Sequence, residues 1–392
     1  MRRWTKRLLA MVLASLLLAG GAAAWKHEQL IRLAAVNTLF DADRIVANFS
    51  AMETMFGSVA LDRGRGPPSA LPEGQRIALP VGAEAWAAAR QVTSLLVLHD
   101  GRIVFEDYYH GTGPEDLRIA WSVSKSWLSA LTGILIAEGA LALDDPLERH
   151  APALAGSAYA GVTVRDVLTM TSGVRFDEDY LDFWSDVNRM GRVLALGGSM
   201  DEFVAGLTER TGPPGRTWAY VSTDSHALAM ALRGATGRSL PELMSDRLVR
   251  PLGLARAPGY LTDGHGVAFA LGGLCLTTRD QARFAQMMLQ EGRWQGRQIV
   301  PRDWARAATA PQAPVPDGAK GYGLQWWLPA DAQDGEFLAE GVYGQYLYVD
   351  RARGVVVVMT AADRGFRGTG VDAGNIAMFR QIATAAQPIS AP

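Results

Sequence analysis

The chain is poor in residues that bind metals or form cross-links. Among its 392 residues there is one cysteine, Cys275, so neither an intrachain disulfide nor a zinc-binding thiolate cluster can form. The six histidines include no HExxH pattern and no close pair. We therefore expect no metal and no cofactor.

The net charge is also small. The formal net charge is -2 at pH 7, and no lysine-rich run occurs. Nucleic acids and strongly acidic partners need a concentrated basic face, which this composition excludes. With 48% hydrophobic residues the chain can bury a large core, so we expect a folded protein that acts on a small molecule and binds no nucleic acid.

Lysine is the rarest of the basic residues. Only 4 of the 38 lysines and arginines are lysines, and one of them, Lys125, lies at the start of the apolar stretch "AWSVSKSWLSALTGILIAEGAL". Arginine stays protonated at working pH, whereas burial can lower the pKa of a lysine until it acts as a base. Lys125 is thus a candidate general base.

Ser122 is the hydroxyl that such a base would activate. Residues three apart on a helix face the same way, so the pattern S-x-x-K brings Ser122 and Lys125 together. The free N–H groups of a first helical turn also stabilise a developing oxyanion. Alone, the pattern is more typical of a serine N-cap beside a snorkelling lysine. The usual serine-hydrolase signature, G-x-S-x-G, is absent.

The N-terminus has the pattern of an export signal. "MRRWTKR" precedes 17 uncharged residues, 8–24, and Ala22 and Ala24 fit an A-x-A cleavage site. The same length reaches the short end of a membrane span, so residues 1–25 are interpreted as a signal peptide or a membrane anchor. We expect an exported, periplasmic protein that is either soluble or attached to the inner membrane by this segment.

The remaining chain divides into a helical lead-in with a Pro/Gly linker, residues 26–75, and a catalytic body, residues 76–392. Two β-rich runs around Asp100-Gly101 predict a hairpin. Helical patterns follow from 122 to about 290, strands return between 322 and 361, and a helix closes the chain at 371–384. This order predicts an α/β (α+β) fold: an antiparallel sheet from the N- and C-terminal parts of the body, flanked by helices, with an inserted, mainly helical region.

Two further segments accompany the S-x-x-K pattern. "PPGRTWAYVSTDSHALAMAL" contains Tyr220 and Ser222 just before a helix, and "AEGVYGQYLYVD" begins a strand near the C-terminus. In this order the segments resemble the S-x-x-K, Y-x-N or Y-x-S, and K-T-G motifs of the penicillin-recognising serine hydrolases. Over residues 90–385 the chain is most similar to the class C β-lactamase-related branch, particularly 6-aminohexanoate-dimer hydrolases and carboxylesterases. A β-lactamase/transpeptidase-like fold is implied.

The resemblance implies a role for each matching residue. Ser122 would be the nucleophile that forms an acyl-enzyme, and Lys125 and Tyr220 would share the proton transfers. This requires Lys125 to lower the pKa of Tyr220. The backbone N–H groups of Ser122 and Gln345 would form the oxyanion hole, and Gly344 would allow the substrate to lie against its strand.

The chain departs from the family pattern at three positions. Val342 occupies the position of the lysine of K-T-G, Tyr343 that of its threonine, and Ser222 that of the asparagine of Y-x-N. The cation and hydroxyl that hold a β-lactam or peptide carboxylate are therefore missing. This favours hydrolysis of a small linear amide or ester over the alternative, a β-lactamase or peptidoglycan DD-peptidase. A catalytically silent binding domain is a second alternative.

The stretch "FDEDYLDFWSDVNRMGR", residues 176–192, is expected to form a loop over the site. In 6-aminohexanoate-dimer hydrolases the corresponding tyrosine lies in the substrate cleft, which makes Tyr180 a binding candidate beside Ser222, Tyr343 and Gly344. Carboxylates in such a loop would favour substrates that carry an amine. The alternative is a solvated acidic loop.

Overall fold

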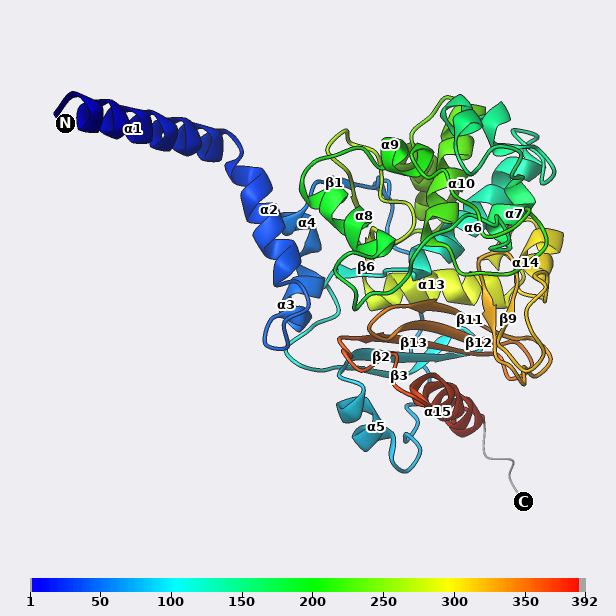
Figure 1. Cartoon of the computed structure of the whole chain (residues 1–392). Coiled ribbons are helices and arrows are strands. Elements are labelled where there is room, and N and C mark those ends of the chain that lie inside the picture. The colour runs from blue at the N-terminus through cyan, green and yellow to red at the C-terminus, as the bar shows by residue number, and fades with distance from the viewer. Residues whose placement is uncertain (1, 388–392) are drawn as a thin grey trace, which may run out of the picture.

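The computed structural model describes residues 2–387, and its centre is a seven-stranded sheet (Figure 1). The strand order is β3-β2-β13-β12-β11-β10-β9, and every pair is antiparallel. The strands are β2 (Val92–His99), β3 (Arg102–Tyr108), β9 (Gly321–Tyr322), β10 (Trp327–Leu328), β11 (Glu336–Gly341), β12 (Gln345–Asp350) and β13 (Val355–Ala361). The predicted sheet, built from the two ends of the body, is confirmed.

The hairpin between β2 and β3 turns at the predicted residues. Asp100 and Gly101 have φ values of 47° and 75°, so both adopt the left-handed conformation of a two-residue type I′ turn. This turn matches the twist of the flanking strands, and Asn-Gly and Asp-Gly are its preferred sequences. The local sequence alone therefore determines this edge of the sheet.

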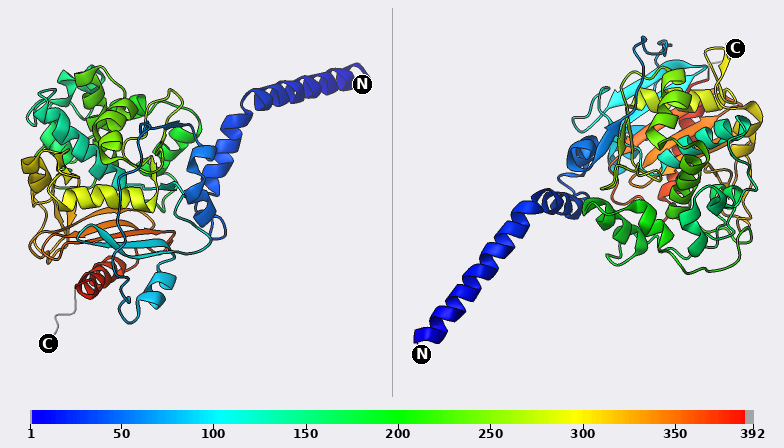
Figure 2. Two further views of the ribbon diagram at one scale, coloured as in Figure 1. Left: turned by 180° about the vertical axis from the view of Figure 1, so that it is seen from behind. Right: turned by 90° about the horizontal axis from the view of Figure 1, so that it is seen from above.

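Helices cover both faces of the sheet (Figures 1 and 2). On one face lie α5 (Ala83–Ala89) and α15 (Val371–Ala385), which share an apolar core with β2, β12 and β13. On the other face lie α6 (Val123–Ala137) and α13 (Thr278–Leu289). All but the last two residues of α6 are buried, so its first turn is held rigidly between the sheet and the helical region.

The helical insertion packs beyond α6 and α13. Its helices are α7 (Val164–Leu168), α8 (Asp186–Ala195), α9 (Met200–Ala205), α10 (Ser222–Thr236), α11 (Leu240–Met244) and α12 (Arg250–Leu252), and α14 (Arg302–Ala308) follows later in the chain. Ser239 and Glu242 form a reciprocal capping box at α11. At α9 only half of such a box is present, because Ser199 accepts from the Glu202 N–H without a returned bond in the described structure.

A second sheet, which the sequence pattern did not predict, connects the N-terminal segment to the body. Its order is β1-β5-β6-β4, and its strands are β1 (Ser58–Ala60), β5 (Gly259–Leu261), β6 (Leu274–Leu276) and β4 (Arg118–Ile119). A third sheet has two strands, β7 (Arg293–Trp294) and β8 (Arg297–Gln298), which form a separate hairpin. Because β4 ends three residues before Ser122, this small sheet fixes the approach to α6.

The N-terminal segment has two parts with different surroundings. Helix α1 (Arg2–Trp25) projects from the body in all three views, whereas α2 (His27–Asn37), α3 (Ile45–Ser50) and α4 (Met52–Met55) lead onto it (Figures 1 and 2). Among the residues that the structure describes, no helix combines the length and apolar character that a membrane crossing requires. The lead-in packs against the body, because α2 contacts α8, α3 contacts β4 and α4 contacts β5.

Candidate active site

Ser122 lies at the N-terminus of α6, directly after a residue with unusual backbone geometry. Trp121 has a φ of 46°, in the left-handed region that is unfavourable for a bulky side chain. Its ring packs against Phe40 and Phe49, at centroid distances of 6.0 and 5.6 Å. This packing holds the sharp turn from β4 into α6, and the turn places the Ser122 hydroxyl beside two cavities.

Lys125 is buried beneath this hydroxyl. Its ammonium nitrogen donates to Ser122 Oγ at 2.9 Å and to the carbonyl oxygen of Leu271 at 2.8 Å. Burial lowers the pKa of Lys125 to about 8, although the negative charges of Glu178 and Asp224 oppose this shift. A substantial fraction of Lys125 is therefore neutral near pH 8 and able to accept the serine proton.

Tyr220 completes this group from the segment before α10. Its ring centroid lies 5.2 Å from Lys125 Nζ, and the ring stacks on Trp327 with a centroid distance of 5.5 Å. Burial and the charge of Glu178 raise the pKa of Tyr220 far above its ordinary value, while the Ser122 hydroxyl opposes the shift. The expectation of a lowered pKa is wrong, because burial dominates and Lys125 is not among the groups that shift the pKa of Tyr220. Tyr220 is thus a neutral phenol that can donate its proton.

Tyr180 and Ser222 meet at a residue that the sequence analysis did not single out, Glu178. The Tyr180 hydroxyl donates to Glu178 Oε2 at 3.0 Å, and the backbone N–H of Ser222 donates to Glu178 Oε1. Burial raises the pKa of Glu178, and Lys125 opposes the shift. The predicted loop of residues 176–192 ends where α8 begins, and its first part delivers a carboxylate close to the catalytic group.

The turn between β11 and β12 approaches Ser122 through Gly341. A Cβ atom added to Gly341 would lie 2.7 Å from the Ala120 carbonyl oxygen and 3.2 Å from the Ser122 backbone nitrogen. Only a glycine permits this approach of β11 to the start of α6. The next residue, Val342, lines both cavities that contain Ser122.

Gln345 and Gly344, which the sequence analysis placed at the oxyanion hole and substrate cleft, do not face the cavities beside Ser122. Among the described residues that line the two cavities, neither is present. Gln345 pairs with Gly341 across the ladder, and its buried amide donates to the Ala361 carbonyl oxygen at 2.8 Å. A Cβ atom on Gly344, whose φ is 87°, would lie 2.9 Å from that of Ala361. The K-T-G-like residues Val342 to Gly344 lie in a turn rather than in a strand, because β11 ends at Gly341 and β12 begins at Gln345.

Tyr343 is held in an aromatic cluster instead of facing a polar substrate group. Its ring stacks on Phe40 at a centroid distance of 4.7 Å and contacts Phe49 and Phe366 at 5.5 and 4.9 Å. It lines the more apolar of the two cavities. Tyr343 therefore replaces the threonine of K-T-G in sequence order but not in surroundings.

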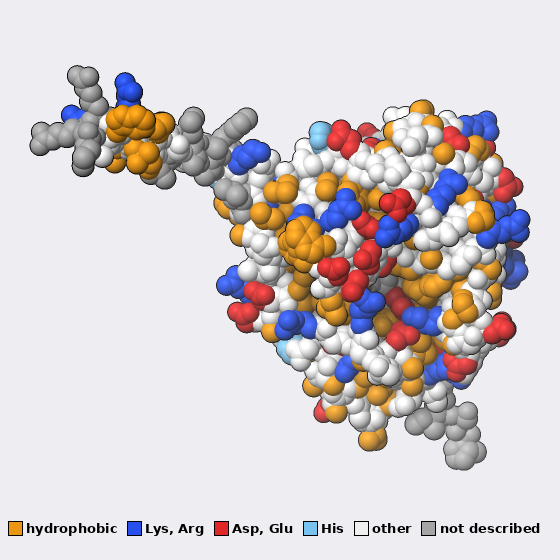
Figure 3. All heavy atoms as spheres, viewed as in Figure 1, with side chains coloured by type: hydrophobic (Ala, Val, Ile, Leu, Met, Phe, Trp, Pro, Cys, Tyr) orange, Lys and Arg blue, Asp and Glu red, His pale blue; other side chains and the backbone are white. Residues whose placement is uncertain are grey.

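The polar cavity, of about 340 Å³, opens on the Tyr220 side of Ser122. Its charged lining comprises Glu178, Lys320, Glu340, Arg367 and Asp372. On the face seen in Figure 3, acidic and basic side chains are intermixed around a hollow near the middle. The cavity thus offers three carboxylates and two cations.

Lys320 supplies an ammonium to this cavity, which the sequence analysis did not anticipate. Its Nζ lies 2.6 Å from both Glu340 oxygens and 3.0 Å from Asp372 Oδ2. These carboxylates raise the pKa of Lys320, so it stays protonated. Since Lys320 already neutralises two acids, it is poorly placed to hold a substrate carboxylate as well.

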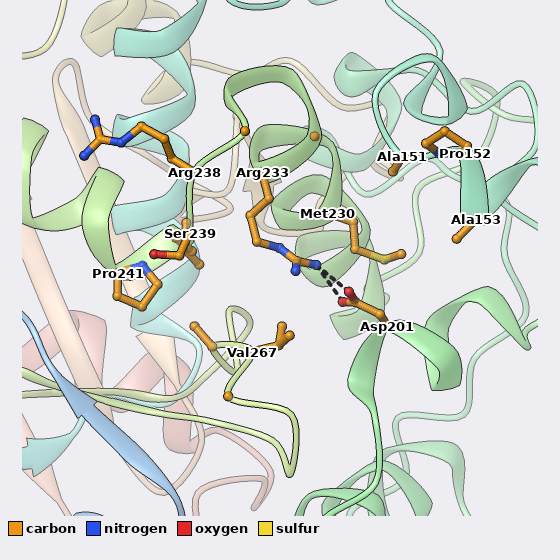
Figure 4. Close-up of a pocket in the computed structure, with 15 residues that line it drawn as sticks. Ala151, Pro152, Ala153, Asp201, Met230, Arg233, Arg238, Ser239, Pro241 and Val267 are labelled. Carbon is orange, nitrogen blue, oxygen red and sulfur yellow. Dashed lines mark hydrogen bonds and ion pairs between the residues drawn. The ribbon is translucent and has the colours of Figure 1, made fainter.

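A separate cavity of about 510 Å³ lies among α9, α10 and α11 (Figure 4). There Asp201 and Arg233 point toward one another, and both Asp201 oxygens accept from Arg233 Nη2 at 2.7 Å. None of the predicted catalytic residues lines it. No group of three or more metal-ligating side chains occurs in the described part of the chain.

Comparison with known proteins points to the same chemistry. The sequence model of the Beta-lactamase family matches residues 81–378. A 6-aminohexanoate-dimer hydrolase from Paenarthrobacter ureafaciens is 29% identical over 291 residues, which cover 68% of this chain and 71% of the relative.

Solved structures share the fold. A provisionally named 6-aminohexanoate-dimer hydrolase from Bacillus anthracis superposes with a TM-score of 0.78 at 21% identity, covering 88% of this chain and 95% of that one. An octameric penicillin-binding protein homologue from Pyrococcus abyssi gives a TM-score of 0.57 at 21% identity, with 76% of each chain covered. Because the family match spans well over half of the sequence, the chain belongs to the Beta-lactamase family and is a hydrolytic enzyme of that serine hydrolase superfamily.

Proposed function

We propose that the protein hydrolyses small linear amides or esters through an acyl-enzyme on Ser122. The observation that carries this proposal is the contact of 2.9 Å between Lys125 Nζ and Ser122 Oγ, in which the lysine has a pKa of about 8. A serine hydroxyl attacks poorly unless a neighbouring base removes its proton. Neutral Lys125 is that base.

The reaction then proceeds in two halves. Ser122 Oγ bonds to the substrate carbonyl carbon while its proton passes to Lys125, and the carbonyl oxygen becomes an oxyanion. We assign the two stabilising N–H groups to Ser122 and Val342, in place of Gln345, because Gly341 brings this turn against Ser122. Collapse breaks the bond to the leaving group, which takes a proton from Tyr220, and Lys125 reprotonates Tyr220. Water cleaves the acyl-enzyme by the reverse proton path.

The leaving group is proposed to occupy the polar cavity. Tyr220 lines this cavity and must reach the departing atom to protonate it. No salt bridge involves Glu178 in the described structure, and the nearby Lys125, which would favour its charged form, is partly neutral near pH 8. This supports a leaving group that carries a cationic amine, as an amide of an amino acid does.

The two alternatives receive less support. β-Lactamase and DD-peptidase substrates carry a carboxylate, whereas both cations of the polar cavity already have acidic neighbours: Lys320 is bonded to Glu340 and Asp372, and Arg367 lies 3.7 Å from Asp179. A silent binding domain has no need for Lys125, whose depressed pKa reduces the stability of the fold at neutral pH.

A fluorophosphonate probe, followed by a substrate library, tests the proposal. We expect the probe to label the wild type and not Ser122→Ala, and linear amides and esters to be hydrolysed. Absence of labelling in the wild type refutes the enzyme and favours the silent domain. A stable adduct with fluorescent penicillin, or turnover of a chromogenic β-lactam in preference to linear substrates, favours the alternative enzyme.

We also propose that residues 1–25 direct export, either as a cleaved signal or as an anchor. The basic start and the uncharged stretch at 8–24 support this proposal. Fractionation of the expressing cells, with N-terminal sequencing of the recovered protein, distinguishes the two forms. An intact chain found only in the cytoplasm contradicts both.

A further inference from the structure

A second, smaller cavity opens beside Ser122, on the side away from the charged residues. Its volume is about 110 Å³, and its lining is mostly apolar. Three separate parts of the chain form its walls: the lead-in segment with Leu39 and Phe40, helix α8 with Met190 and Gly191, and the stretch around Phe269. The lead-in lies outside residues 81–378, which the family model matches.

The lead-in wall is fixed in place. Phe49 is fully buried, and its ring contacts Trp121 and Tyr343 at centroid distances of 5.6 and 5.5 Å. The buried guanidinium of Arg118 donates to the Val46 carbonyl oxygen at 3.1 Å and to Ser50 Oγ at 2.7 Å. Burial and these bonds make the segment a permanent part of the cavity.

The cavity offers no charge to a ligand. The amide of Asn188 is used within the protein, since it donates to the carbonyl oxygens of Tyr180 and Asp182 at 3.2 and 2.7 Å. Among the described lining atoms, the only buried side-chain nitrogen or oxygen without a partner is Trp121 Nε1, an uncharged indole donor. A charged group placed here would lose its hydration without compensation.

The position of Tyr220 determines which half of the substrate enters the apolar cavity. Tyr220 lines the polar cavity and is absent from the lining of the apolar one. The leaving group takes the Tyr220 proton, so it must depart on the polar side. The acyl group, which stays on Ser122, then extends to the opposite side.

We propose that the apolar cavity binds the acyl part of the substrate and selects a short, uncharged aliphatic acyl group, with the lead-in as its specificity-determining wall. This inference rests on the proposed function. The volume of about 110 Å³ is smaller than the roughly 150 Å³ engineered cavity that holds benzene. An acyl chain of roughly four to six carbons fits this space.

A series of p-nitrophenyl esters, from acetate to decanoate, tests this with the full chain. We expect kcat/KM to rise about fourfold for each methylene that enters the cavity, and to fall beyond about six carbons. Gly191→Leu adds bulk to the cavity lining, and its Cβ atom meets nothing within 4 Å that it would clash with. We expect this variant to lower the hexanoate-to-acetate ratio of kcat/KM about thirtyfold.

Two further variants secure the result. Gly374→Leu is the matched control: Gly374 also lies in a helix with nothing within 4 Å of an added Cβ, but it lines neither cavity at Ser122, and its profile should equal that of the wild type. Phe40→Ala enlarges the cavity and should move the optimum of kcat/KM to longer acyl chains. This variant still tests the acyl pocket if Gly191→Leu does not fold.

The outcomes separate this inference from the proposed function. Ester hydrolysis that depends on Ser122 but has a flat chain-length profile, unchanged in Gly191→Leu or in Phe40→Ala, overturns the acyl pocket and leaves the hydrolase intact. Failure of Ser122 to react with the fluorophosphonate probe refutes the proposed function itself. A preference for charged acyl groups also contradicts the inference.

Discussion

The rate of acylation should follow the ionisation of Lys125. With a pKa of about 8, roughly a tenth of Lys125 is neutral at pH 7 and roughly nine-tenths at pH 9. We therefore expect kcat/KM for a p-nitrophenyl ester to rise about tenfold between these pH values, with one midpoint near 8. A lysine with the ordinary pKa of 10.5 would be neutral about three-hundredfold less often at pH 7.

The assay compares the wild type with two variants across pH 6 to 10, about the range in which such groups titrate. Lys125→Arg keeps the positive charge but cannot deprotonate, so we expect a loss of at least about a hundredfold and no rise with pH. Glu340 titrates in the same cavity, with a pKa raised by burial and by Asp372, and Glu340→Gln should retain the midpoint near 8. A wild-type profile that is flat between pH 7 and 9, or an active Lys125→Arg, refutes Lys125 as the base.

Three further predictions follow from the same geometry. Tyr220→Phe should lower kcat/KM for anilides at least about a hundredfold and for p-nitrophenyl esters less than tenfold, because only the amine needs a proton to leave; equal losses contradict its role. Gly341→Ala should remain folded by circular dichroism but react with the fluorophosphonate at least about a hundredfold more slowly, since the new Cβ crowds Ser122; wild-type reactivity contradicts the oxyanion assignment. Between pH 8 and 10.5 the unfolded chain holds a proton on Lys125 that the folded chain lacks, so stability rises with pH. Relative to Lys125→Met, the wild type should gain about 2 kcal/mol in urea unfolding from pH 7 to pH 9.5, and an unchanged difference contradicts the depressed pKa.

The sequence predicted the features that depend on neighbouring residues. The turn at Asp100-Gly101 follows from the conformations of those two residues, and the contact between Ser122 and Lys125 follows from helical spacing. The burial that lowers the Lys125 pKa was also visible, as the apolar run behind it.

Features that depend on distant pairing were not predictable in the same way. The pattern of "AEGVYGQYLYVD" predicts a strand that begins at Val342, and only the pairing of Gly341 with Gln345 shows that the chain turns between them. The pKa of Tyr220 depends first on its burial and then on Glu178, which a distant loop brings close to it. The lead-in wall depends on contacts such as Phe40 with Tyr343, which no local pattern encodes.

Acyl-enzyme formation on Ser122 is the central claim, and mass spectrometry of protein quenched during ester turnover tests it most directly. We expect the mass to increase by one acyl group, on the peptide that contains Ser122, and we expect Ser122→Ala to show neither adduct nor turnover. Turnover without an adduct on this peptide, or turnover that survives in Ser122→Ala, contradicts the account.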